Sequence, residues 1–157
     1  MMRDSLDKGK DVGLLILRLG LGAMFIYHGA PKLFGGIERW GKIGAAMGNF
    51  SIHFLPQFWG FMSGVAEFGG GICLILGLIF RPAMVFLVIN LVVAAASHFA
   101  RGQGLGGASH AIENAIMFLG LAFAGPGKFS LETWLKAGRA KAADSSGKTQ
   151  DPTAENG

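Results

Sequence analysis

Ionisable and amide side chains occur inside or beside the long apolar stretches of this 157-residue chain. They are Arg18, His28, Lys32, Glu67, Asn90, His98, His110, Glu113 and Asn114. Such side chains are costly in hydrocarbon, and those that a membrane segment retains mark binding sites or ion pathways by default. We therefore treat all nine as candidate ligand-binding residues. Glu67 and Glu113 are also candidate proton carriers, because a buried carboxyl group can hold a proton.

The spacing of these residues places several of them on common helix faces. His110, Glu113, Asn114 and Met117 stand at i, i+3, i+4 and i+7, so a helix over this stretch carries them on one face. Glycines at positions 60, 64, 70 and 71 surround Glu67, and small residues let a second helix approach closely. Glu67 is therefore expected to face the interior of a helix bundle.

Charges inside a low-dielectric bundle are expected to pair, and the pattern predicts that Arg18 meets Glu67 and Glu113. Two interpretations remain open. The three charges form a structural ion-pair cluster, or they belong to a polar cavity in the outer half of the bundle, floored by Arg18, that binds a ligand.

Metal chemistry is not indicated. His28 and His98 both fall near span ends, too shallow for a buried haem pair, and His110 with Glu113 provides only two ligands. The single cysteine, Cys73, leaves no intrachain disulfide or dithiol. We predict no metal site.

Four apolar stretches must position these side chains, at about residues 12–30, 59–80, 83–99 and 109–125. Each falls within the roughly 17–25 residues that cross a bilayer. Hydrophobic residues make up 51% of the chain and charged residues 15%, too few charges for an ordinary soluble domain. The sequence predicts an all-α, polytopic membrane protein with a bundle of four transmembrane helices. The basic residues flank the apolar stretches, which excludes a nucleic-acid partner and leaves the lipid bilayer.

The connections between the spans are also informative. Ile37, Trp40, Ile43, Met47 and Phe50 recur at helical spacing between spans one and two. This pattern predicts an amphipathic helix, which either lies at the membrane interface or plugs the mouth of the bundle. Arg81-Pro82 predicts a tight turn between spans two and three, since proline suits the first turn of a new helix. After span four, Ser130 is expected to cap a short helix that carries Trp134.

The distribution of basic residues orients the chain. Four spans put both termini on one side, together with Arg3, Lys8, Lys10, Arg81, Lys128, Lys136, Arg139, Lys141 and Lys148. The other side holds Lys32, Arg39, Lys42 and Arg101. The positive-inside rule therefore predicts cytoplasmic termini. We expect a cytoplasmic segment at 1–11, a membrane domain at 12–136 and a disordered polar tail at 137–157.

Three stretches in this order resemble the DoxX family of small bacterial membrane proteins. They are LLILRLGLGAMFIYHGAPKLF, with Arg18, His28 and Lys32; GVAEFGGGICLILGLIFRPA, with Glu67; and AIENAIMFLGLAFAGPGKFSLE, with Glu113 and Asn114. The resemblance covers about residues 12–134. It implies a four-helix bundle in the bacterial inner membrane.

The resemblance also implies a function. Members of the family resemble subunits of thiosulfate:quinone oxidoreductases or take part in membrane complexes that handle thiols. A membrane subunit of such an oxidoreductase, with a quinone or sulfur-anion site and a partner subunit, is the first hypothesis. A non-enzymatic transporter or binder of small solutes is the second, and a structural scaffold is the third. The oligomeric state is not predicted.

Overall fold

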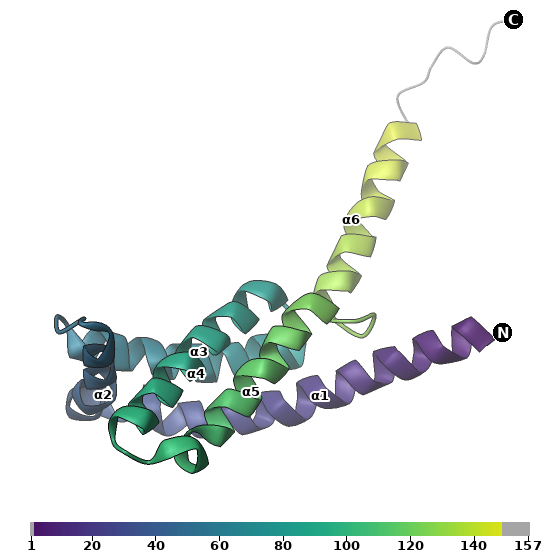
Figure 1. The fold of residues 1–157 in the computed structure, drawn as a ribbon. Coiled ribbons are helices and arrows are strands. Elements are labelled where there is room, and N and C mark those ends of the chain that lie inside the picture. The colour runs from purple at the N-terminus through teal and green to yellow at the C-terminus, as the bar shows by residue number, and fades with distance from the viewer. Residues whose placement is uncertain (1, 149–157) are drawn as a thin grey trace, which may run out of the picture.

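The computed structural model describes the backbone of residues 2–148 and the side chains of residues 8–140 and 142. All regular structure in this part of the chain is helical: α1 (Met2–Leu33), α2 (Gly36–Gly44), the 3-10 helix η1 (Ala45–Phe50), α3 (Pro56–Leu76), α4 (Phe80–Ala100), α5 (Gly104–Ala124) and α6 (Leu131–Lys148). In Figure 1, α1, α3, α4 and α5 run side by side as a bundle, α2 and η1 lie at one end, and α6 extends away from the other end.

Helices α1 and α3 pack backbone to backbone through glycines. A Cβ on Gly71 would lie 2.8 Å from the carbonyl oxygen of Gly22, and a Cβ on Gly29 would overlap the backbone nitrogen of Phe68. Near the end of α1, a Cβ on Gly64 would lie 2.8 Å from Cα of Leu33. We refer to this contact as the glycine seam. The predicted role of the glycines around Glu67 is confirmed.

Helices α4 and α5 form the second close pair, and a core of apolar side chains joins the two pairs. The buried core includes Phe25 of α1, Leu74 of α3, Leu87 of α4 and Phe118 of α5. The rings of Phe25 and Phe118 meet edge to face with centroids 4.7 Å apart, which links α1 to α5.

Arg18 joins α1 to two other segments at the end of the bundle opposite α2. Its guanidinium donates four hydrogen bonds of 2.7–2.9 Å to backbone carbonyls, those of Leu74 and Ile75 in α3 and those of Pro126 and Phe129 in the α5–α6 connection. The residue is 1% exposed. We call this cluster the Arg18 junction. It satisfies carbonyls at the end of α3 that have no partner within the helix.

Gly77 closes α3 beside this junction. Its φ of 63° lies in the left-handed region, and a Cβ there would lie 2.5 Å from Nη2 of Arg18. The α3–α4 turn therefore requires glycine for its conformation and for the room that the guanidinium occupies. Glu132 of α6 secures the same turn: its backbone N–H donates to the carbonyl of Gly77 at 3.2 Å, and its carboxylate accepts from the N–H of Phe80 at 3.4 Å.

Several helix boundaries differ from those expected. The predicted turn at Arg81-Pro82 lies earlier, at Gly77–Ile79, so both residues belong to the first turn of α4. The helix expected between spans one and two is present as α2, and η1 extends it. The backbone N–H of Thr133 donates to Oγ of Ser130 at 3.2 Å, as expected for the cap of α6. That helix continues to Lys148, where the sequence predicted a disordered tail from residue 137, and residues 149–157 lie outside the described chain.

Three helical segments of the described chain are long and apolar enough to cross a membrane: Lys8–Leu33, Pro56–Leu76 and Phe80–Ala100. The protein is thus an integral membrane protein with several candidate spans. Helix α5 has 21 residues, as many as α3 and α4, but is not among these segments. His110, Glu113 and Asn114 lower its mean hydropathy.

The junction predicts a large effect of Arg18→Met on stability. The substitution leaves four carbonyls without their donor, and we expect a loss of about 3 kcal/mol or more of unfolding free energy. Thermal unfolding of the purified protein in detergent measures it. Arg81→Met is the matched control, because Arg81 is exposed near the same end of the bundle. Equal stability of the two variants would contradict the structural role of the junction.

Candidate functional site

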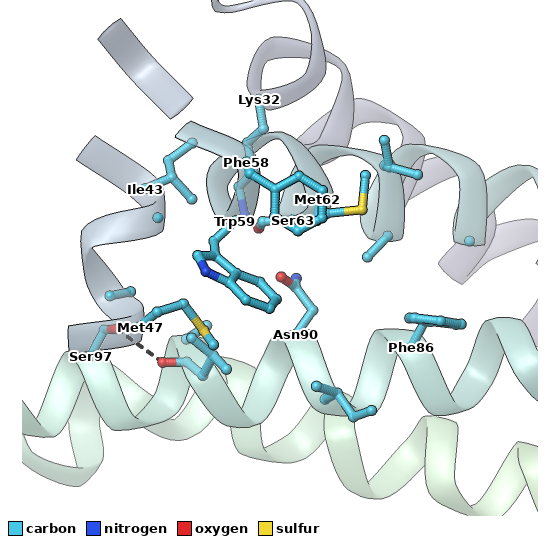
Figure 2. A pocket seen from close by; sticks show the side chains of 18 of the residues that line it. Lys32, Ile43, Met47, Phe58, Trp59, Met62, Ser63, Phe86, Asn90 and Ser97 are labelled. Carbon is cyan, nitrogen blue, oxygen red and sulfur yellow. Dashed lines mark hydrogen bonds between the residues drawn. The ribbon is translucent and has the colours of Figure 1, made fainter. Parts of the chain in front are cut away.

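A large groove lies between α3 and α4, with a volume of about 1300 Å³. Figure 2 shows its apolar walls, with Phe58, Trp59 and Met62 on α3 and Phe86 on α4. The groove exists because α3 and α4 contact each other far less than α3 contacts α1 or α4 contacts α5. A long channel of this composition suits an apolar molecule or an apolar chain.

Helix α2 and η1 border one end of the groove. A Cβ on Gly44 or on Gly60 would overlap backbone atoms of Pro56 or Trp40, so α2 lies directly on the start of α3. The indole nitrogen of Trp40 donates to the carbonyl of Lys32 at 2.8 Å. On the other side, Nδ2 of Asn49 in η1 donates to Oγ of Ser97 in α4 at 3.2 Å. These contacts favour a plug over the end of the groove.

Polar groups are concentrated where α1, α3 and α4 meet. The ammonium group of Lys32 lies 2.5 Å from Oε1 of Glu67, and Nδ2 of Asn90 donates to the same oxygen at 2.9 Å. Glu67 is 4% exposed. Lys32 and Asn90 line the groove, while Glu67 lies behind them, away from its surface. We call these residues the Lys32–Glu67–Asn90 cluster.

The second oxygen of Glu67, Oε2, is buried and has no hydrogen-bond partner among the described residues. A buried polar atom without a partner costs about 1–3 kcal/mol, and more when it carries charge. Buried groups in this condition are therefore rare and are found where a proton or a ligand binds. The cluster joins a surface that a ligand can touch to a buried carboxyl oxygen that can accept a proton.

The glycine seam positions this cluster. Because Gly29 allows α1 to touch the backbone of α3 at Phe68, the end of α1 brings Lys32 level with Glu67. Asn90 lies inside α4, and Figure 2 shows its amide directed towards α3. Each member therefore comes from a different helix.

The structure separates Arg18 from the glutamates with which we expected it to pair. Its hydrogen bonds go to the four carbonyls of the Arg18 junction, and Glu67 pairs with Lys32. The predicted pairing is wrong because backbone carbonyls at a helix end are acceptors that side-chain spacing does not reveal. Arg18 is also absent from the walls of the groove.

Four of the five remaining predicted residues form a separate group on α1 and α5. The rings of His28 and His110 lie with centroids 6.1 Å apart, and Nδ2 of Asn114 donates to the carbonyl of His110 at 2.8 Å. Glu113 is exposed, and its side chain has no partner among the described residues. These four residues do not line the groove.

His98 also has a different neighbour from His28, with which it was considered as a pair. His98 lies on the groove wall, and its Nδ1 is 2.5 Å from Oε1 of Gln103. It does not form a pair with His28, whose neighbour is His110. In the described part of the chain, no three His, Cys, Asp or Glu side chains come together as a metal centre requires.

The aromatic and thioether side chains of the groove were missed as site residues. On α3, Trp59, Met62, Ala66, Gly69 and Cys73 face the groove at intervals of three and four residues. This period is visible in the sequence, but an apolar stripe in a membrane helix is normally assigned to lipid or to the core. Only the separation of α3 from α4 makes it a site.

These features define an all-helical integral membrane protein with an apolar groove in its bundle. The chain belongs to the DoxX family, whose sequence profile matches residues 13–100. The match covers α1 to α4, and thus the groove and the Lys32–Glu67–Asn90 cluster. No curated protein and no solved structure matches the chain significantly.

Because the glycine seam holds α1 against α3, we predict that Gly29→Ala destabilises the protein. The added methyl group overlaps the backbone of α3, forces α1 away and should cost about 2 kcal/mol of unfolding free energy. Thermal unfolding in detergent measures the loss. Gly69→Ala is the control, because a Cβ at Gly69 meets nothing within 4 Å. That variant should match or slightly exceed the parent in stability. A neutral Gly29→Ala would show that α1 and α3 are not in close contact.

Proposed function

We propose that this protein is the membrane subunit of an oxidoreductase system, and that the α3–α4 groove takes a quinone from the bilayer. The observation that carries the proposal is the Lys32–Glu67–Asn90 cluster, which places an ammonium and an amide on a largely apolar wall, backed by an unpartnered carboxyl oxygen. Quinones have an apolar tail and a polar ring whose carbonyls accept hydrogen bonds. The groove supplies complementary surfaces for both parts.

The cluster also suits the proton balance of quinone chemistry. A quinone takes up two electrons and two protons to become a hydroquinone. Lys32 can donate a proton to a carbonyl in the groove. Glu67, whose unpartnered Oε2 can take up a proton from water, can pass that proton to the neutral amine and restore the ion pair, and a second cycle supplies the second proton. The electrons come from a thiol or reduced sulfur substrate bound to a partner subunit: two thiols release two electrons and two protons as they form a disulfide. This division assigns ligand binding and proton handling to the present chain.

The arrangement in the membrane belongs to the same proposal. Helix α5 matches α3 and α4 in length and packs along α4, which supports a fourth span. Both described ends of the chain lie at the end of the bundle that holds the Arg18 junction (Figure 1). With the predicted excess of basic residues there, this end is cytoplasmic in a bacterial inner membrane. The Lys32–Glu67–Asn90 cluster and the plug then lie towards the outer side.

Binding of quinone to the groove can be measured by quenching of tryptophan fluorescence, since Trp59 lines the groove. Titration of the protein in nanodiscs with a long-chain quinone should quench this signal. Gly69→Phe fills the groove from a position with open space, and we expect affinity to fall about tenfold or more. Gly20→Phe is the matched control: the same side chain is added at an open position of α1, away from the groove.

Turnover gives the second part of this test. Thiosulfate or a thiol is supplied with quinone to the protein and its co-purifying partners, and Glu67→Gln should lower the rate of quinone reduction about tenfold or more, while it weakens binding less. If the protein neither binds quinone nor supports turnover with any partner, the proposal is wrong. Solute uptake into proteoliposomes that Glu67→Gln abolishes would instead assign the protein to the transporters.

A further inference from the structure

The proposed function does not use the polar side chains that lie together on α1 and α5, which are His28, His110, Glu113 and Asn114. Glu113, His28 and His110 are all exposed, and they share one side of the bundle with Met24 of α1 and Met117 of α5, which are 51% and 40% exposed. The rings of His28 and His110 are neighbours, so both helices contribute to a continuous surface. We call it the α1–α5 face.

The depth of Glu113 makes this exposure unusual. It is the tenth residue of the 21-residue helix α5, close to the middle of the helix. In the proposed four-span arrangement, this position lies near the centre of the bilayer. A carboxyl group there that faces lipid is expensive, so a polar side chain at this depth normally faces protein or water. The described part of the chain does not provide that cover.

We propose that a second copy of this chain covers the α1–α5 face and forms a dimer across it. The face is complementary to itself, since it presents a carboxyl acceptor and two imidazoles that can donate. A two-fold axis perpendicular to the membrane keeps every residue at its own depth. Glu113 and His110 are three residues apart, or about 4.5 Å along the helix, so the carboxyl group of each copy meets an imidazole of the other within one turn.

The surface around these groups allows the approach. Gly106 and Gly120 lie seven residues before and after Glu113 on the same side of α5, and a Cβ on either would meet nothing within 4 Å. Small residues that flank a polar side chain are typical of helix contacts in membranes, where close packing and hydrogen bonds between helices replace the hydrophobic effect. The two exposed methionines supply adaptable apolar surface at the same level.

Disulfide cross-linking in native membranes tests the geometry. In a Cys73→Ser background, Met117→Cys places a thiol on the α1–α5 face, and mild oxidation should yield a species of twice the monomer mass. Val85→Cys is the matched control: Val85 is 51% exposed and lies at a similar depth on α4, away from this face. It should remain monomeric. A cross-link to a protein of another mass would assign the face to a different partner and overturn the proposal.

Glu113→Leu tests the energetics in purified protein. We expect the dimer to dissociate about tenfold more readily in detergent, as native mass spectrometry over a dilution series reports. If the face instead met lipid, removal of the carboxyl group would raise thermal stability and Met117→Cys would yield no cross-linked dimer, and this outcome also overturns the proposal. Quinone binding in the α3–α4 groove is measured separately with Gly69→Phe, so either proposal can fail without the other.

Discussion

The structure depends on a single guanidinium group. Arg18 donates to carbonyls of α3 and of the α5–α6 connection. One side chain of α1 therefore links that helix to the C-terminal end of α3 and to the segment between α5 and α6. These carbonyls need donors because they are at the end of a helix or in a connection, where backbone partners are lacking. The arginine needs acceptors because it is fully buried among apolar residues. Each satisfies the other, and this mutual requirement explains why an arginine can persist in a membrane helix without a carboxylate partner.

The groove follows from how the four long helices are paired. Glycines bring α1 and α3 into backbone contact, and α4 and α5 form the other close pair. The two pairs are joined at one end by the turn at Gly77, beside the Arg18 junction. Along the rest of their length, α3 and α4 diverge enough to leave space between them, and the Lys32–Glu67–Asn90 cluster lies where all three neighbouring helices still reach one another.

Much of the fold was accessible from the sequence, because length and apolarity define membrane helices and glycines define where they touch. The helical class, the family and the cap at Ser130 were all predicted. The site was harder to predict, because each side chain has several possible partners at helical spacing. Glu67 and Lys32 were both identified as candidates, yet the ion pair between them was not predicted, because Glu67 was assigned to Arg18. Arg18 was assigned to a carboxylate because sequence patterns reveal side chains and not free carbonyls. The groove depends on the distance between two helices, which no local pattern encodes.

The two ends of the groove differ in how they are closed. Near Gly77 the covalent turn and the Arg18 junction fix the helices together. At the other end, η1 is linked to α4 by the hydrogen bond from Asn49 to Ser97, while α2 is attached to α3. The long side between these ends is bordered by no loop of the described chain. A hydrophobic molecule dissolved in the membrane can therefore enter the groove laterally from the bilayer, without passing through water.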